Sequence, residues 1–416
     1  MLAPLTTRSA RALLSPSARV LVAAADPDGG IARVRELPWS DVHWPTLVSL
    51  TSFERAAAQV FRLLRAAPEG AVPDDVTNTM QRIFRVAVFR SDELSDAAGA
   101  ACDALEHAGV AALWLKGAAL AMQSAEAFSV RSMGDLDVLV DPAQHDTARR
   151  ALLAAGWATG VPDPSYDVHH HDAPLFWRAG IRLELHDGLF PPGHPFADDS
   201  AESWIGRGVA RLWGTRAVTV LPPAWHVVHA SAHWAWNHEG EIGTWQYLHD
   251  LQRLTGPWGS AADEWHRVVQ AAELINARQP VGWALWLGSR LGSASVDERA
   301  MQRLRGPSRM LTAVEEREWV LRAFHSPAAS PSVAWSRFWW RRSMAGLGEA
   351  AGSWPWCAGR TAPASGLGGP LPTTSPLQRT DPQIERESDP GSELRAGTRS
   401  GTVARWRRHL DRVLRG

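Results

Sequence analysis

The clearest structural signal in this chain of 416 residues is Arg-Ser-Met-Gly-Asp-Leu-Asp-Val-Leu-Val, residues 131–140. From residue 135 onward the pattern has a period of two, which is typical of a β-strand because successive side chains point to opposite faces. Leu136, Val138 and Val140 form the apolar face. Asp135 and Asp137 therefore share the other face, with α-carbons roughly 6.6 Å apart.

Two carboxylates placed in this way suit a hard divalent cation. Mg²⁺ takes oxygen ligands and keeps waters that substrate phosphates can replace, and Mn²⁺ accepts similar ligands. The competing interpretation is an exposed strand face that happens to carry two acids. The apolar alternate positions favour an internal strand, where unpaired acids are costly. We therefore expect Asp135 and Asp137 to be metal ligands.

A second motif lies just upstream, where residues 115–120 read Leu-Lys-Gly-Ala-Ala-Leu. Lys116 is the only lysine among 43 basic residues. Lysine is a compact point charge, so its retention points to a place beside phosphates or carboxylates, although chance is the alternative. The preceding run, 110–115, predicts a short buried strand, and helical character resumes at Ala118. Gly117 would then lie at a strand-to-helix turn that permits close approach of a phosphate.

The third acid comes from a predicted hairpin. Residues 169–177 and 181–186 read as two strands joined through a turn at 178–180. Alternation places Glu184 on one face with Arg182 and His186. If the second strand pairs beside Asp135–Asp137, the three carboxylates and Lys116 form a phosphoryl-transfer centre, in which one carboxylate accepts a proton from the attacking hydroxyl.

The rest of the chain reads as mainly helical, giving an α+β fold class. One amphipathic stretch is expected over 52–64, a second helix begins near Ser91, and 203–345 reads as helical and rich in tryptophan. A helix is also expected after Asp141-Pro142, a cap with proline in the first position. The expected domains are a helical N-terminal region (1–100), an α+β core (101–200) and a helical C-terminal domain (201–345). A disordered linker (346–402) and an amphipathic tail helix (403–416) are expected to follow.

Composition excludes several classes of function. The net charge is −1 and 21% of residues are charged, so there is no basic excess for nucleic acid, which is an unlikely partner. The two cysteines lie far apart, which disfavours disulfides and thiolate zinc sites and suits a cytoplasmic setting. The apolar run 20–25 is too short for a membrane span, so no membrane association is expected.

Histidines supply the competing chemistry. His229 and His233 are four residues apart on a predicted helix, with His226 and His238 nearby, and this spacing can hold a transition metal. A histidine-dependent metal phosphohydrolase of the HD type is thus a rival hypothesis. The surrounding tryptophans favour a packed helix bundle instead. The run 169–171, three histidines, could be ordinary polar contacts or a metal site.

The motifs resemble those of a known superfold. Gly117, the segment 135–137 and Glu184 look like the three motifs of the nucleotidyltransferases that share a core with DNA polymerase beta. More narrowly, the segments 115–120, 131–140 and 183–186 resemble an uncharacterised bacterial nucleotidyltransferase-like family with LKG and RxxGDxDxLV motifs. The segments 226–233 and 245–254 are similar to that family's helical half. The resemblance implies a polymerase beta-like core, a short mixed sheet with helices, between helical flanks.

The resemblance also implies an activity: transfer of a nucleoside monophosphate from a nucleoside triphosphate to a hydroxyl-type acceptor with Mg²⁺ or Mn²⁺. The acceptor would be a small molecule, a peptide or a protein. The implied catalytic and metal-binding residues are Asp135, Asp137 and Glu184. The implied nucleotide-binding residues are Lys116, Gly117, Ala118, Arg131, Gly134 and His186. Ala118 stands where the superfamily usually has Gly or Ser, so a catalytically silent nucleotide-binding or partner-binding protein is the second hypothesis.

Overall fold

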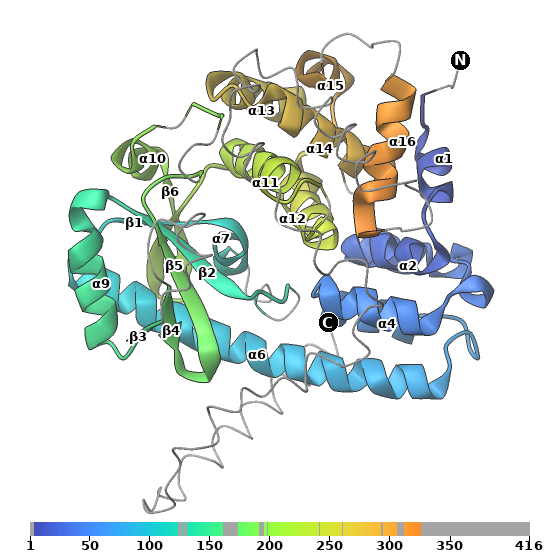
Figure 1. Ribbon diagram of the computed structural model, residues 1–416, viewed down its shortest axis with the longest axis horizontal. Helices are drawn as coiled ribbons and strands as arrows, with labels where there is room; N and C mark the ends of the chain where they lie inside the picture. The colour runs from blue at the N-terminus through green and yellow to red at the C-terminus, as the bar shows by residue number, and fades with distance from the viewer. Residues whose placement is uncertain are drawn as a thin grey trace, which may run out of the picture. The chain divides into compact units, whose positions relative to one another are not determined.

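The structure is a computed structural model, and Figure 1 shows its ribbon. It describes residues 4–325 except for a few short segments, namely 124–127, 129–130, 161–173, 191–194, 198, 241, 260, 293 and 306–311. The predicted linker and tail helix, 346–402 and 403–416, lie outside the described residues, as does the histidine run 169–171.

The strands of the described chain form one mixed sheet. Its strand order is β3-β4-β5-β2-β1-β7-β6. The strands are β1 (Ala112–Trp114), β2 (Asp135–Val140), β3 (Ala158–Thr159), β4 (Leu175–Trp177), β5 (Ile181–His186), β6 (Val209–Trp213) and β7 (Arg216–Val220). β2 runs parallel to β5 and β1 runs parallel to β7, whereas the other neighbours are antiparallel. The sheet and the surrounding helices confirm the α+β class.

The apolar face of the sheet packs against long helices. Leu136 and Val138 of β2 and Leu183 of β5 are fully buried in one core with residues of α6 (Asp74–His107) and α9 (His145–Ala154). A short 3₁₀ turn, η3 (Pro142–Gln144), leads into α9, and the Asp141 side chain accepts a hydrogen bond from the Ala143 N–H as the predicted cap. The opposite face of β2 is left to Asp135 and Asp137.

The N-terminal helices differ from the prediction at two points. α6 begins at Asp74 rather than near Ser91, because Val76, Met80 and further apolar side chains continue the same buried face. The predicted single helix over 52–64 is broken at Arg55, which has a positive φ of 56°. The helices before β1 are α1 (Thr7–Ala12), α2 (Pro16–Ala25), α3 (Pro27–Ala32), α4 (Trp44–Phe53), α5 (Ala57–Arg65) and α6, with the 3₁₀ turns η1 (Val34–Glu36) and η2 (Trp39–Asp41).

Of the region predicted to be helical, 203–345, the structure has helix at 203–207 and again after residue 220, and residues 326–345 lie outside the described residues. The prediction of helices throughout 203–345 was wrong for β6 and β7, which form a hairpin around Gly214 (φ 62°) and extend the sheet. Pairing of β7 with β1 is a tertiary contact that local patterning does not reveal. The other elements are α7 (Lys116–Met122), η4 (Arg178–Gly180), α10 (Ala201–Arg207), α11 (Pro223–Asn237), α12 (Thr244–Thr255), η5 (Gly256–Trp258), α13 (Ala262–Leu274), α14 (Arg278–Leu291), α15 (Glu298–Arg305), α16 (Thr312–Arg322) and η6 (Ala323–His325).

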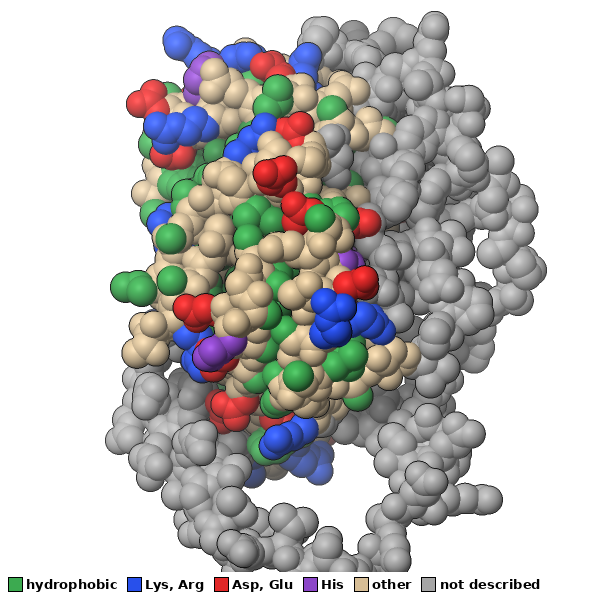
Figure 2. Space-filling view, turned by 90° about the vertical axis from the view of Figure 1, so that its left-hand side faces the viewer, with side chains coloured by type: hydrophobic (Ala, Val, Ile, Leu, Met, Phe, Trp, Pro, Cys, Tyr) green, Lys and Arg blue, Asp and Glu red, His purple; other side chains and the backbone are tan. Residues whose placement is uncertain are grey.

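Tryptophans form much of the interior of the helical half, as predicted. Trp245, Trp265 and Trp286 are fully buried, and Trp283 stacks on Trp319 with ring centroids 5.7 Å apart. Within the part of the chain that the structure describes, no helix is both long and apolar enough to cross a membrane. On the face shown in Figure 2, acidic and basic side chains are interspersed.

Candidate active site

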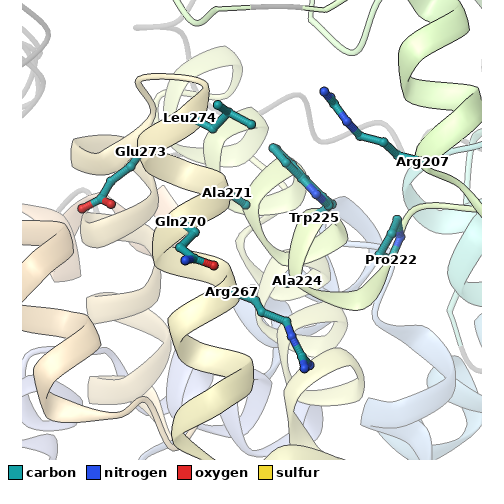
Figure 3. A pocket seen from close by; sticks show the side chains of 9 residues that line it. All are labelled: Arg207, Pro222, Ala224, Trp225, Arg267, Gln270, Ala271, Glu273 and Leu274. Atoms are coloured by element: carbon teal, nitrogen blue, oxygen red, sulfur yellow. The ribbon is translucent and has the colours of Figure 1, made fainter.

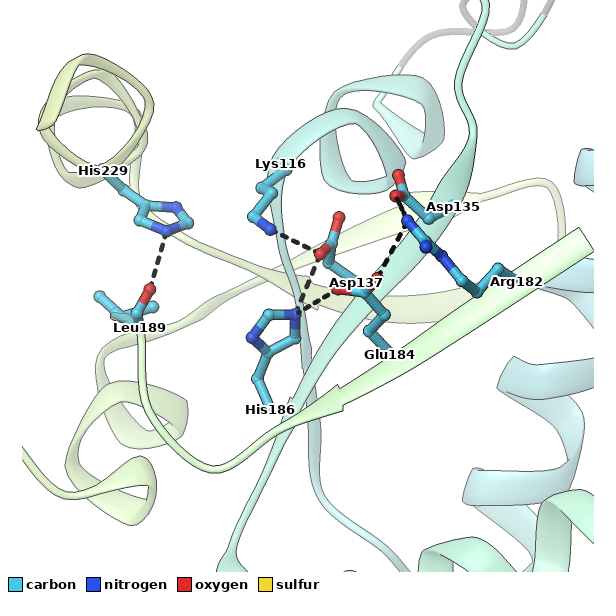
Figure 4. A network of polar contacts seen from close by, with 8 residues as sticks. All are labelled: Lys116, Asp135, Asp137, Arg182, Glu184, His186, Leu189 and His229. Atoms are coloured by element: carbon cyan, nitrogen blue, oxygen red, sulfur yellow. Dashed lines mark hydrogen bonds and ion pairs between the residues drawn. The ribbon is translucent and has the colours of Figure 1, made fainter. Parts of the chain in front are cut away.

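The pairing of β2 with β5 brings the predicted acids together. The strands run parallel, with Asp137 opposite Glu184 and Asp135 opposite Arg182. The second hairpin strand thus lies beside Asp135–Asp137, the condition on which a site with three carboxylates depends. Because side chains two apart share a face, Glu184 and His186 project on the same side as the two aspartates. The polar face of two neighbouring strands therefore carries the site (Figure 4).

Three of these side chains can surround a cation. The ligand atoms of Asp137, Glu184 and His186 all lie within 4.8 Å of one another, and all three residues are buried. Among the described residues, this is the one cluster of histidine, cysteine or acidic side chains close enough to hold a metal. Two carboxylates suit Mg²⁺ or Mn²⁺, and the imidazole is better suited to Mn²⁺. The donor set therefore fits a divalent cation.

Lys116 reaches the centre of this cluster. The Leu115 N–H donates a hydrogen bond to the carbonyl oxygen of Asp137, which fixes the end of β1 beside that residue. The Lys116 Nζ then lies 2.7 Å from Asp137 Oδ1, and His186 Nε2 lies 3.0 Å from the same oxygen. Lys116 has a positive φ of 47°, which is uncommon for a residue with a side chain and is often found at functional sites.

The charges in the cluster stabilise one another. Burial alone would raise the pKa of Asp137, but the Lys116 ammonium and the His186 hydrogen bond outweigh it and lower that pKa well below the usual range. Burial would likewise lower the pKa of Lys116, but Asp137, Glu184 and Asp135 raise it instead. Asp137 is thus an ionised carboxylate and Lys116 a charged ammonium at neutral pH.

Arg182 is a site residue that the sequence analysis placed on the correct face but did not select. Its Nη2 lies 2.6 Å from Asp135 Oδ2 and 3.1 Å from Glu184 Oε1. Asp135 is more exposed than Asp137, with 30% against 5% of the side chain accessible. Alternation along β5 was the signal that could have identified Arg182, since it lies two residues before Glu184.

Arg131 occupies a different environment from these residues. Its Nε and Nη2 donate hydrogen bonds of 2.5 and 2.8 Å to the two carboxylate oxygens of Asp250 on α12. Gly117 allows this placement, because a Cβ there would lie 2.0 Å from Arg131 Nη1. Ala118 follows as a fully buried residue of α7. The structure therefore places Arg131 in a buried, two-pronged ion pair beside Gly117.

The loop 131–134 is held from two sides. On one side, Gln246 of α12 donates a hydrogen bond of 3.2 Å to the carbonyl oxygen of Ser132. On the other, the guanidinium of Arg55 covers Gly134, where a Cβ would lie 2.2 Å from Nη1. Helix α12 and the turn after α4 thus position the residues that lead into Asp135.

Glu54, the residue before Arg55, connects the turn after α4 to helix α12. Its carboxylate accepts a hydrogen bond of 2.8 Å from the N–H of Trp245 in the first turn of α12. Burial raises the pKa of Glu54 to about 7, although that hydrogen bond acts in the opposite direction. No local pattern in the sequence links residue 54 to residue 245, so this support was not predictable.

The histidines of α11 lie outside the cation-binding cluster. His229 Nε2 lies 3.1 Å from the carbonyl oxygen of Leu189 (Figure 4). The ring of His229 also packs edge-on against Phe190. Burial, with a smaller effect of Lys116, lowers the pKa of His229 to about 3. Burial also lowers the pKa of His226 to about 4 and that of His233 well below its ordinary value. These rings are neutral, packed side chains, as the helix-bundle interpretation predicted.

A surface pocket of about 790 Å³ lies elsewhere, between α10, α11 and α13 (Figure 3). Trp225 lines it, and the guanidinium of Arg207 lies over the rings of Trp204 and Trp225. None of its lining residues belongs to the acidic cluster. The geometry of the carboxylates, rather than this pocket, therefore marks the site.

Comparison with known proteins agrees with this arrangement. A family described as "uncharacterised nucleotidyltransferase" matches residues 40–292, more than half of the chain. The matched segment includes the supports in the N-terminal helices, the acidic cluster and α12. No curated protein sequence matches the chain. The chain belongs to this family of uncharacterised nucleotidyltransferases.

Proposed function

We propose that this protein transfers a nucleoside monophosphate from a nucleoside triphosphate to a hydroxyl-type acceptor, using a divalent cation and a polymerase beta-like core. One observation carries the proposal: Asp135, Asp137 and Glu184 lie on adjacent parallel strands, with Lys116 against Asp137. These three acids face two permanently charged side chains, Lys116 and Arg182, and the remaining negative charge favours a function that uses a cation and phosphate.

In this reaction the acceptor oxygen attacks the α-phosphorus of the nucleotide. The bond between that phosphorus and the oxygen that bridges to the β-phosphate breaks, pyrophosphate leaves, and the hydroxyl proton passes to a carboxylate. Asp137 is a poor proton acceptor because Lys116 and His186 hold its pKa low. We assign that role to Asp135 and Glu184, which lie 2.6 and 3.1 Å from Arg182 on the same face of the sheet.

Asp137, Glu184 and His186 would hold the cation, together with Asp135. When bound, Mg²⁺ or Mn²⁺ would neutralise phosphate charge and polarise the phosphoryl oxygens. Lys116 keeps Asp137 ionised and adds a positive charge beside the phosphates. The loop before Asp135 is kept in place by two contacts. Arg131 forms an ion pair with Asp250 of α12, and the guanidinium of Arg55 lies over Gly134.

The test is transfer of α-phosphate label from ATP, GTP, CTP and UTP, with Mg²⁺ or Mn²⁺, in purified protein and in cell extract. We expect the wild type to label an acceptor and the double variant Asp135→Asn, Asp137→Asn to lose the activity. Asp146→Asn, an exposed acid on α9, is the matched control and should keep it. Full cation-dependent transfer by the double variant would contradict the proposal.

A second candidate is a nucleotide-binding protein without catalysis. Two observations favour it: Ala118 lacks the hydroxyl that the superfamily usually offers, and cationic side chains already pair with the acids. Nucleotide binding that depends on the acids, without label transfer to any acceptor, would support this candidate over the enzyme.

A further inference from the structure

Each carboxylate of the acidic cluster is paired with a cationic side chain. Arg182 bridges Asp135 and Glu184 through one nitrogen, at 2.6 and 3.1 Å. Lys116 contacts Asp137 at 2.7 Å. Three carboxylates therefore face two permanently charged side chains, and the cluster is close to neutral before any metal binds.

Arg182 contacts one oxygen of each of two carboxylates, Asp135 and Glu184, that would hold a metal ion. A divalent cation bound by Glu184 and Asp135 would lie close to the guanidinium, and like charges at such a distance repel strongly. Binding of the cation alone must therefore displace Arg182 or be weakened by it. If a polyphosphate bound together with the cation, the phosphate oxygens would offer the guanidinium new hydrogen-bond partners, and its place near the cation would then be favourable.

The position of Arg182 permits such an exchange. Its side chain is 35% accessible, and Asp135 beside it is 30% accessible, so the bridge lies at the open edge of the cluster. Lys116 and Asp137 lie deeper. Arg182 is also the second residue of β5, which leaves its backbone fixed while the long side chain can change rotamer.

Arginine is suited to this double use. Its planar guanidinium pairs with carboxylates and with phosphate oxygens through the same set of parallel N–H donors. A lysine at this position would offer a point charge without that geometry.

We propose that Arg182 is a phosphate-binding residue: it shields Asp135 and Glu184 in the free protein and moves to the polyphosphate when cation and nucleotide bind together. The inference rests on the proposed function. It adds Arg182 to the site and states that the cation and the nucleotide bind together rather than the cation first. The consequence is that the free protein binds a divalent cation weakly, whereas the cation–polyphosphate complex binds well.

Two affinities of the full-length chain test this inference. The first is the dissociation constant of Mn²⁺ alone, from the free-ion signal in electron paramagnetic resonance. The second is that of Mn²⁺–tripolyphosphate, from tryptophan fluorescence, since this probe needs no choice of base. For Arg182→Gln we expect binding of Mn²⁺ alone to tighten about tenfold and binding of Mn²⁺–tripolyphosphate to weaken about tenfold, the scale of one charged hydrogen-bond pair.

The opposite signs distinguish this role from a structural one, which would weaken both affinities. Arg178→Gln, a neighbouring arginine in the η4 turn, is the control and should change neither. Arg182→Lys should keep the shielding of the acids and lose part of the polyphosphate affinity. The inference is overturned if Arg182→Gln leaves binding of Mn²⁺ alone unchanged, or if binding of Mn²⁺–tripolyphosphate does not weaken.

The proposed function and this inference fail in different ways. Label transfer that depends on Asp135 and Asp137, combined with unaltered affinities in Arg182→Gln, would leave the function standing and remove the inference. A wild type that binds no Mn²⁺–tripolyphosphate would overturn both.

Discussion

The acidic cluster on β2 and β5 and the histidine row on α11 are both sets of buried titratable side chains, yet they differ in charge. Asp137 has Lys116 and His186 against one oxygen, and its pKa is lowered despite burial. His229 has no carboxylate against its ring among the contacts that shift its pKa, and burial, with a smaller effect of Lys116, lowers that pKa to about 3. The acids are therefore charged and the histidines neutral at pH 7.

This difference decides between the two chemistries that the sequence offered. A site for phosphoryl transfer needs fixed charges that oppose one another, and of these two regions the acidic cluster has them. A histidine-based metal site needs several ring nitrogens that converge on one point, and among the described residues those of α11 do not form such a set. The charged partners around a group are thus more informative than its burial or its spacing in the sequence.

The largest effect should come from a substitution in the acidic cluster. Asp137→Asn removes the carboxylate that Lys116 and His186 hold and that a cation would share. We expect nucleotidyl transfer to fall about a thousandfold, roughly 4 kcal/mol in the activation barrier. The rate of α-phosphate transfer at saturating nucleotide measures it. His229→Gln should reduce the same rate less than tenfold, and a larger loss from the histidine variant would reverse the comparison.

Next in size is the effect of the ion pair that joins the acidic strand to helix α12. Arg131, in the loop before β2, pairs with Asp250 on α12, and both side chains are nearly inaccessible. Arg131→Ala leaves an unpaired buried carboxylate, so the free energy of unfolding should fall by about 3 kcal/mol. Urea denaturation followed by tryptophan fluorescence measures the loss. The double variant Arg131→Ala, Asp250→Ala should recover part of it, and a sum of two independent losses would argue against coupling.

The strands and the acids of the site were predictable because local patterns encode them. Alternation in 135–140 and 181–186 identifies β2 and β5, and it sets Glu184 and His186 on the face of the aspartates. The single lysine pointed to Lys116, which lies 2.7 Å from Asp137. Both signals, the alternation of side chains and the short motifs, can be recognised in the local sequence without information on distant contacts.

The supports of the site were not predictable, for the opposite reason. The ion pair of Arg131 with Asp250 joins residues 119 positions apart, and the hydrogen bond from Trp245 to Glu54 joins residues 191 apart. Arg131 reads in the sequence as a nucleotide-binding residue because its motif surrounds Asp135. Which partner a buried guanidinium takes depends on tertiary packing, and neither periodicity nor a motif contains that information.

The two motif glycines offer a finer test of how the site is supported. A Cβ at Gly117 would lie 2.0 Å from Arg131 Nη1, and one at Gly134 would lie 2.2 Å from Arg55 Nη1. Arg131 is fixed by Asp250, whereas Arg55 is exposed and its guanidinium can move aside. Gly117→Ala should therefore lower the free energy of unfolding by about 2 kcal/mol, and Gly134→Ala by less than about 1 kcal/mol. Equal losses in urea denaturation would show that Arg131 is no more rigid than Arg55.

The smallest effect is the pH dependence of stability that the neutral histidines cause. The pKa of His229 is about 3 in the folded chain, below the value of about 6.5 in the unfolded chain. Between these values the unfolded state binds the proton, so stability is complete above about pH 6.5 and decreases as the pH falls toward 3. Glu54, whose pKa is raised to about 7, acts in the opposite direction, because its stability contribution decreases as the pH rises from about 4.5 to 7.

The histidine term can be isolated by comparing variants rather than by reading the wild-type curve. From pH 7.5 to 5.5 the contribution of His229 should decrease by roughly 1 kcal/mol, and His229→Gln should lack this decrease while the Glu54 term stays in both proteins. Urea denaturation at a series of pH values gives the difference. His107→Gln, at the exposed end of α6, is the control variant for this comparison. A slope that is the same in His229→Gln and the wild type would mean that His229 takes up its proton equally in the folded and unfolded chains, and the contrast between charged acids and neutral histidines would then not hold.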